Sequence, residues 1–154
     1  MSWLDDVHEI EQVIYAYAIA IDTRDWDLLD ACFAPDAAIQ MSVAGRYPSP
    51  AAYRDKARAT LATLDATHHV FSSPRIVPDG EGARAHTYYQ AQHARNDLAP
   101  DSLLVIGGWV EDRFARRDGR WVITARHGTA VWFDGNPHVL GLDVGRGANP
   151  ALGR

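Results

Sequence analysis

The sequence predicts an α+β fold, because helical and strand periodicities occupy separate parts of the chain. Apolar residues recur at spacings of three and four up to about Leu64, and an alternating pattern with a period of two begins at Thr67. Short connections join the later strands, which must therefore run antiparallel. A long twisted sheet curls, so helices across its concave side would close it into a cone with an apolar interior.

Helical patterns fill the first third of the chain. The first helix carries an apolar stripe through Ile14 and Ile21, while Asp25 and Ser49 are good N-caps for two further helices. Pro50 suits the first turn of the third helix. The expected elements are helices at Asp5–Asp22, Trp26–Phe33 and Pro50 to about Leu64, with a short strand near Ala37–Met41.

Four long strands are expected after the helices. The pair Asp118-Gly119 is the strongest signal for a β-hairpin in the chain. The composition of residues 78–82 predicts a turn. The expected fold is a cone-shaped α+β barrel, with three N-terminal helices packed on a curved antiparallel sheet of four long strands plus a short one. We expect a single domain at 1–136 and a Gly-rich C-terminal tail at 137–154. The long strands are expected at Thr67–Val77, Ala83–Arg95, Leu103–Arg116 and Trp121–Trp132.

Composition excludes several classes of function. A net charge of −5 over 154 residues disfavours nucleic acid and anionic membrane surfaces as partners. No apolar run is long enough to span a bilayer, and the acidic N-terminus lacks a signal core. The lone Cys32 cannot support a disulfide framework, so we expect a cytoplasmic protein in which this cysteine belongs to the core. The sequence contains no metal-binding, phosphate-binding or dinucleotide motif, so neither a metal nor a cofactor is expected.

The strongest candidate site combines Asp22 with one of two adjacent histidines. His68 and His69 lie on an expected strand, so their side chains point to opposite faces and one of them faces inward. Asp22 lies at the end of an apolar stripe, where a carboxylate is unusual without a partner. An Asp22–His69 hydrogen bond would fix the imidazole tautomer and leave the other ring nitrogen as a base. The alternatives are that Asp22 caps the next helix and that His69 is a structural histidine.

Further candidates line the same expected pocket. His93 shares a strand face with small residues and could act as a second acid or orient a ligand, unless it lies at the surface. Arg126 could be a pocket cation or could pair with a nearby aspartate. The tryptophans of the sheet are expected in packing or at an interface first and in the pocket wall second. The candidates are Asp22, His69, His93 and Tyr17 as catalytic residues, with Tyr15, Phe71, Tyr89, Arg126 and Trp132 as substrate-binding residues.

Four segments carry a resemblance to a known family: YAYAIAIDTRDWDLLDACFAPDAAI, THHVFSS, YYQAQHAR and VIGGWVEDRFARRDGRWVITAR. From about Ile10 to Gly135 the chain resembles the SnoaL-like group of the nuclear-transport-factor-2-like superfamily, especially its scytalone-dehydratase-like branch. The resemblance matches Asp22 and His69 to the family's aspartate and T-x-H histidine. It matches His93 approximately to a second histidine of the scytalone dehydratases.

Two further matches come from individual branches of the family. Tyr17 matches a tyrosine of a bile-acid dehydratase, and Arg126 corresponds to a basic residue of a related dehydrochlorinase. The same dehydrochlorinase has a lysine where this chain has Tyr17. Scytalone dehydratase has a tyrosine where this chain has Ile21. The resemblance therefore implies the Asp–His base but leaves the accompanying acid open.

The resemblance implies a cofactor-free cone that often forms dimers or trimers through its sheet. We expect a dehydratase-type lyase in which Asp22 and His69 form a general base that removes a carbon-bound proton from an apolar cyclic substrate in a buried pocket. The alternatives are an isomerase or cyclase of polyketide- or steroid-like ketones, and a small-molecule-binding module without catalysis. A homodimer or homotrimer is expected, with a small apolar molecule as the other partner.

Overall fold

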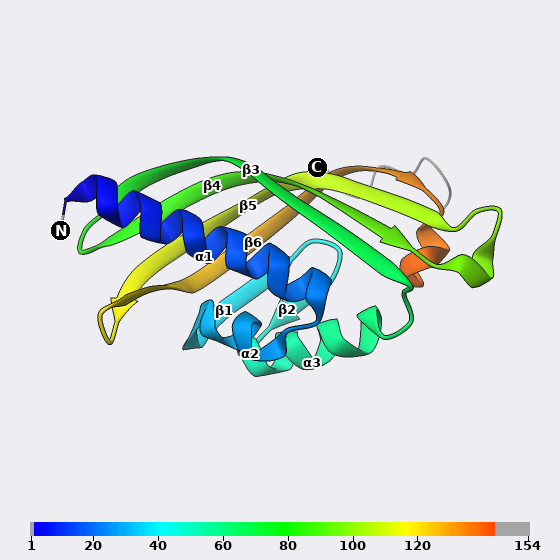
Figure 1. Cartoon of the computed structure of the whole chain (residues 1–154), viewed down its shortest axis with the longest axis horizontal. Helices are drawn as coiled ribbons and strands as arrows, with labels where there is room; N and C mark the ends of the chain where they lie inside the picture. Colours follow the sequence, from blue (N-terminus) through cyan, green and yellow to red (C-terminus); the bar gives the residue numbers. More distant parts are fainter. Residues whose placement is uncertain (1, 144–154) are drawn as a thin grey trace.

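The computed structural model describes residues 2–143 (Figure 1). The chain forms three α-helices, a single mixed sheet and two short 3₁₀ helices within these residues. The strand order across the sheet is β2-β1-β6-β5-β4-β3. The elements are α1 (Trp3–Thr23), α2 (Trp26–Ala31), β1 (Phe33–Met41), β2 (Gly45–Tyr47), α3 (Pro50–Leu61), β3 (Ala66–Asp79), β4 (Gly82–Ala94), η1 (Asn96–Leu98), β5 (Leu103–Arg117), β6 (Arg120–Gly135) and η2 (Pro137–Leu140).

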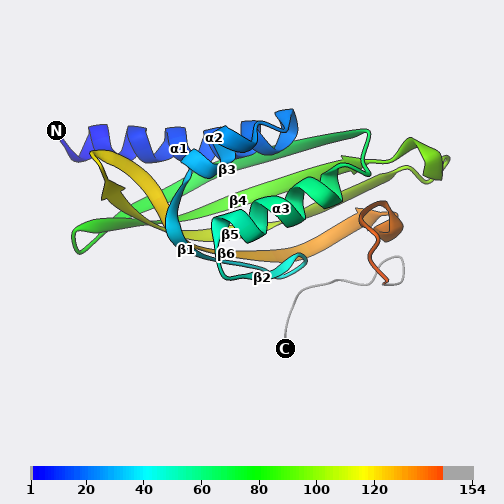
Figure 2. The same cartoon turned by 90° about the horizontal axis from the view of Figure 1, so that it is seen from below.

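The three helices lie on one face of the curved sheet, as Figure 2 shows, so the expected α+β cone is confirmed. Helix α1 packs on β3 and β6, and α3 packs on β1 and β2. The apolar stripe of α1 is buried against the sheet, with Ile10 and Ile14 inaccessible to solvent. No helix of the described part of the chain is long and apolar enough to cross a membrane.

The capping residues act as the sequence indicates. The Leu28 backbone N–H donates to the Asp25 carboxylate (3.0 Å), and the Ala52 N–H donates to the Ser49 hydroxyl (3.2 Å). Both helices therefore begin where expected. At the β5–β6 hairpin, Asp118 and Gly119 adopt φ values of 51° and 78°, the left-handed conformation that this two-residue turn requires.

Two features of the sheet differ from the expectation. The described residues contain six strands rather than five, because the three-residue β2 was not expected. The sheet is also not purely antiparallel, since β1 runs parallel to β6 with Ile39 opposite Arg126. Strand β1 starts at Phe33, which was expected to end the second helix. Its pairing with β6 connects residues far apart in sequence, so local patterning could not indicate it.

Small residues on the inner face of β4 leave room inside the cone. Ala85, Thr87 and Ala91 face inward and are almost inaccessible to solvent, as the alternation of this strand indicates. A bulge in the β5–β6 pairing falls between Gly107 and Gly108. Bulges bend the strand in which they occur and increase its twist. The sheet can therefore curl around the helices and enclose an interior space.

The first residues of the expected C-terminal tail pack against the domain. Within 137–143, the short helix η2 buries Val139 completely, and Gly141 ends it with φ 66°. Residues 144–154 of the expected tail lie outside the described residues. The domain boundary at residue 136 stays a prediction.

Replacing Gly108 should destabilise the fold, because a Cβ there would lie 1.9 Å from the carbonyl oxygen of Thr129. We expect Gly108→Ala to lower the free energy of unfolding by roughly 2–3 kcal/mol through overpacking at the bulge. Chemical denaturation measures this change. Arg120→Ala, at an exposed position of β6, serves as the control and should stay within about 0.5 kcal/mol of the wild type. Equal stability of both variants would contradict the close approach of β5 and β6.

Candidate active site

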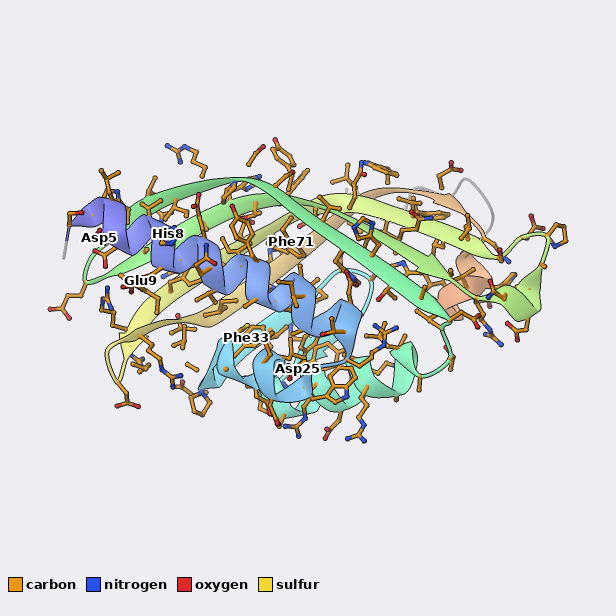
Figure 3. All side chains as sticks on the ribbon, in the orientation of Figure 1. Asp5, His8, Glu9, Asp25, Phe33 and Phe71 are labelled. Carbon is orange, nitrogen blue, oxygen red and sulfur yellow. The ribbon has the colours of Figure 1, made fainter. Side chains whose placement is uncertain are left out.

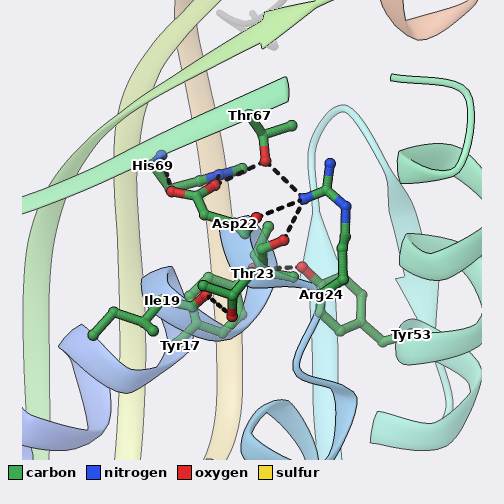
Figure 4. A network of polar contacts seen from close by, with 9 residues as sticks. Tyr17, Ile19, Asp22, Thr23, Arg24, Tyr53, Thr67 and His69 are labelled. Atoms are coloured by element: carbon green, nitrogen blue, oxygen red, sulfur yellow. Dashed lines mark hydrogen bonds and ion pairs between the residues drawn. The ribbon is translucent and has the colours of Figure 1, made fainter. Parts of the chain in front are cut away.

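The carboxylate of Asp22 joins the last turn of α1 to strand β3 (Figure 4). Its Oδ2 accepts the backbone N–H of His69 at 2.7 Å. Its Oδ1 lies 2.7 Å from Nδ1 of the His69 ring and accepts the hydroxyl of Thr67 at 2.9 Å. Asp22 therefore does not cap the next helix, a role that Asp25 fills. The expected contact between Asp22 and His69 is present.

These hydrogen bonds define the protonation of the pair. Burial alone would raise the pKa of Asp22, but the hydrogen bonds from the ring and backbone of His69 and from Thr67 hold it below its usual value. An ionised carboxylate only accepts hydrogen bonds, so Nδ1 of His69 carries the hydrogen in this contact. The other ring nitrogen, Nε2, makes no hydrogen bond to any residue in 2–143. In the tautomer with hydrogen on Nδ1, Nε2 is the proton acceptor of the ring.

His69 lines a cavity of about 390 Å³ inside the cone. Its walls come from α1, α3, the sheet and the segment after β1, and they are mainly apolar and aromatic. Phe71, Tyr89 and Ala91 continue the wall from His69 across β3 and β4. The lining residues are Tyr17, Ile21, Met41, Ser42, Val43, Ala44, Tyr47, Tyr53, Lys56, Ala57, Thr60, Leu61, His69, Phe71, Tyr89, Ala91, His93, Ile106, Val110, Leu140, Gly141 and Leu142.

A pair of tyrosine hydroxyls forms a second polar group in this cavity. The hydroxyls of Tyr17 on α1 and Tyr53 on α3 share a short hydrogen bond, although the residues lie 36 positions apart. The ring of Tyr17 makes edge contacts with Phe33 and Phe71, which approach α1 from opposite sides in Figure 3. Burial raises the pKa of Tyr53 well above its usual value, so this phenol stays protonated. Only Tyr17 of this pair was expected from the sequence.

Arg126, expected as a substrate-binding residue, is not among the residues that line the cavity beside His69. Its Nε and Nη2 each donate to Asp112 at 2.7 Å, and both side chains are inaccessible to solvent. Burial by itself would lower the pKa of Arg126, but Asp112 raises it above the usual value. The ring of Tyr17 covers the guanidinium at 3.9 Å from the ring centroid. The ion pair weighed as the alternative is therefore the observed state.

His93 lies in the cavity wall, and its ring meets that of His69 edge to face at 5.6 Å. Burial, followed by the nearby His69, lowers the pKa of His93 to about 4. The ring is therefore neutral at pH 7, and the expected role as an acid does not fit its environment. Its buried Nδ1 has no hydrogen-bond partner among the described residues. His93 could therefore orient a substrate that carries a hydrogen-bond donor.

Tyr15 and Trp132, expected as substrate-binding residues, are not among the residues that line this cavity. Tyr15 follows Ile14 on α1, and one residue turns a helix by about 100°, which directs this ring to solvent. Trp132 lies opposite Gly107 on the outer face of the sheet, and its indole covers the position where a Gly107 side chain would lie. Helix periodicity directs Tyr15 outward. On β6 the bulge between Ala130 and Trp132, which pair with Gly108 and Gly107, breaks the alternation and turns Trp132 to the outer face.

Sequence reasoning missed three polar contributors to the site. Thr67 faces the same side of β3 as His69, and the T-x-H spacing could have indicated it. Arg24 follows α1 in a left-handed conformation with φ 62°, and its Nη1 donates to Thr67 Oγ1 at 2.8 Å. Tyr53 carried no local signal, because its partner lies on a distant helix.

Other chemistries find little support in the described residues. Cys32 is buried, and burial raises the pKa of its thiol to about 11, which suits a core residue rather than a nucleophile. Within 2–143, no group of three or more His, Cys, Asp or Glu side chains is placed to hold a metal ion.

Comparison with known proteins identifies the family. The model of the SnoaL-like domain matches residues 2–127, so the chain belongs to this family, as its sequence indicated. It is 28% identical over 128 residues to the uncharacterized protein Rv2910c of Mycobacterium tuberculosis (strain ATCC 25618 / H37Rv). That match covers 80% of this chain and 84% of the relative.

Solved structures share the fold at low sequence identity. The Kfla4162 protein from Kribbella flavida superimposes with a TM-score of 0.83 at 20% identity, over 92% of this chain and 100% of that one. A hexachlorocyclohexane dehydrochlorinase, LinA type 2, superimposes with a TM-score of 0.77 at 18% identity, over 94% and 96% of the two chains. At such identities these likenesses establish the cone-shaped fold and leave the chemistry to the site itself.

The buried His93 should make stability depend on pH. Its pKa is about 4 in the folded protein and near 6.5 when the ring is solvated, so the unfolded chain binds more protons between these values. Stability should therefore fall as pH falls through this window, by about 3 kcal/mol in total. We expect His93→Gln to lack this part of the loss in denaturation experiments at pH 7 and pH 4. His138→Gln, at an exposed position, should retain the wild-type slope, and equal slopes for all three proteins would contradict a buried neutral His93.

Proposed function

We propose that the protein is a cofactor-independent lyase of the dehydratase type, in which His69 removes a carbon-bound proton. One observation carries the proposal: Asp22 holds Nδ1 of His69 at 2.7 Å, while Nε2 has no hydrogen-bond partner among the described residues and lies in the wall of a mainly apolar cavity. A positioned base of this kind typically accelerates proton transfer about 10²–10⁴-fold. The carboxylate stabilises the imidazolium that forms when the ring accepts the proton.

The mechanism uses the two polar groups of the cavity. Nε2 of His69 takes the proton from carbon, and the electron pair of the C–H bond moves toward an adjacent carbonyl, which Tyr17 polarises with its hydroxyl. The electrons then return to expel a hydroxyl group from the next carbon, and the proton on His69 leaves with it as water. The low polarity of the cavity strengthens each of these interactions.

The cavity wall favours an apolar ring compound as the substrate. Aromatic side chains from β3, β4 and both neighbouring helices surround a volume of about 390 Å³, which suits a molecule of two or three fused rings. A dehydrochlorinase that shares this fold is named for hexachlorocyclohexane, itself an apolar ring. Both features support an elimination reaction on a cyclic molecule.

An isomerase or cyclase is the second candidate, and the state of His93 favours it. Burial keeps His93 neutral, with a pKa of about 4, so this residue is a poor acid for a leaving hydroxyl. Isomerisation and cyclisation use the same proton abstraction without a leaving group. The mass of the product separates the candidates, since elimination loses water and isomerisation loses nothing.

The outer face of the sheet suits a homodimer or homotrimer. Val70, Tyr88 and Trp132 form an exposed apolar patch there, with Trp109 at its edge. Contiguous apolar patches of this kind usually mark an interface. Association through this face would leave the cavity on the opposite side of the sheet free for a small-molecule substrate.

Hydrogen exchange at carbon tests the proposed base. We expect the wild type to catalyse incorporation of deuterium from heavy water into a bicyclic ketone such as 2-tetralone, as measured by mass spectrometry. His69→Ala should reduce this rate at least about 100-fold, because the base is lost. Asp22→Asn should reduce it strongly as well, because the tautomer of His69 is no longer fixed.

The adjacent histidine provides a matched control. His68 belongs to the same strand but points away from the cavity, so His68→Ala should exchange at the wild-type rate. Equal exchange by wild type and His69→Ala would end the proposal. Tight binding of ring ketones without any exchange would instead support a binding module.

A further inference from the structure

Lys56 is the only lysine in the sequence, and it belongs to the wall of the cavity that contains His69. No arginine, aspartate or glutamate is among the described residues that line this cavity. The wall therefore carries one permanent cation and no carboxylate, although the whole chain has a net charge of −5. A single cation in a mainly apolar wall favours a ligand that brings a negative charge.

Solvent exposure places Lys56 at the mouth of the cavity. The exposed members of the lining come from α3, from the segment after β1 and from the end of η2, and they are Ser42, Ala44, Lys56 and Gly141. The other lining residues are buried or half-buried. A charged group of a ligand would lose its water in the apolar interior, at a large cost in free energy, but would keep part of that water at the mouth.

No carboxylate of the described residues neutralises Lys56. Its neighbour Asp55 pairs with Arg54 at 3.2 Å, and the same arginine pairs with Asp30 of α2. No acidic residue lies three or four positions from Lys56 on α3, where a helix would allow an ion pair. Lys56 makes no hydrogen bond or ion pair with any residue in 2–143. Its ammonium group is therefore available to a ligand.

We propose that Lys56 binds a carboxylate of the substrate at the mouth of the cavity, with the hydroxyl of Thr60 as a second donor. This inference rests on the proposed function and narrows its substrate class to cyclic ketones that carry a carboxylate. Thr60 lies one turn after Lys56 on α3, lines the same cavity, and makes no side-chain hydrogen bond with the described residues. An ammonium and a hydroxyl at this spacing can each donate to one carboxylate oxygen.

The order of the strands separates this anion site from the base. Strand β3, which carries His69, is one edge of the sheet, whereas α3 packs on β1 and β2 at the other edge. Lys56 and His69 therefore belong to different walls of the cavity. The carboxylate lies at the end of the substrate remote from the carbon that loses its proton. Holding it at the mouth directs the apolar rings inward, toward the imidazole.

Two ligands that differ in charge test the anion site. 6-Carboxy-2-tetralone is ionised at neutral pH, and its methyl ester is the uncharged analogue. We expect the wild type to bind the carboxylate about tenfold more tightly than the ester, as measured by isothermal titration calorimetry. This is the lower end of the range for charged hydrogen bonds, because Lys56 is exposed. High salt should weaken the preference, since it screens exposed charges.

Variants of α3 assign the preference to its residues. Lys56→Gln removes the cation and keeps a polar side chain, so it should bind the two ligands equally. Lys56→Arg should retain the preference, because it keeps the charge. Thr60→Val should weaken carboxylate binding about threefold and leave ester binding unchanged. Arg58→Gln removes a cation from an exposed position of the same helix outside the cavity, so it should bind both ligands as the wild type does.

Three results would overturn the inference. The first is a wild type that binds the carboxylate no more tightly than the ester, and the second is a preference that persists in Lys56→Gln. The third is loss of the preference in His69→Ala, which would place the anion at the imidazole. Binding needs no turnover, so a carboxylate preference without deuterium exchange would overturn the lyase and leave the Lys56 site standing.

Discussion

The carboxylate of Asp22 is the constraint on which the rest of the site depends. It accepts hydrogen bonds from the backbone and ring of His69 and from Thr67, so one side chain fixes both the approach of α1 to β3 and the tautomer of the imidazole. Arg24 supports the same contact by donating to Thr67. These hydrogen bonds offset the free-energy cost of removing the carboxylate from water, which would be large if the group had no partner.

The interior of the cone combines apolar walls with a few polar groups, and a defined partner holds Asp22, Tyr17 and Arg126. Asp112 holds Arg126, Tyr53 holds Tyr17, and burial keeps His93 neutral. Polar groups fixed in this way do not need to reorganise when charge develops during a reaction. The hollow on the outer face of the sheet differs from the cavity, because the described residues that line it include no histidine or carboxylate.

Membership of the SnoaL-like family establishes the architecture, and the site narrows the chemistry. Structures that superimpose on this chain with TM-scores of 0.83 and 0.77 share only 20% and 18% of its residues. The same cone can therefore carry very different cavity walls. In this chain a hydrogen-bonded tyrosine pair lies in the wall, and the buried Arg126 packs against the ring of Tyr17.

The sequence by itself determined the starts of α2 and α3, the alternation of β4 and the β5–β6 hairpin, and it marked Asp22 as a candidate for a buried partner. Each depends on residues close together in the chain, through capping, periodicity or turn conformation. Only the tertiary structure decided that β1 runs parallel to β6, that Tyr53 meets Tyr17 and that Arg126 lies beneath that ring. These contacts join distant segments, and the curvature of the whole sheet sets which of them meet. Local patterns do not show the bulge in β6 that turns Trp132 outward or the pairing with Asp112 that holds Arg126 in the core, so neither residue could be placed from the sequence.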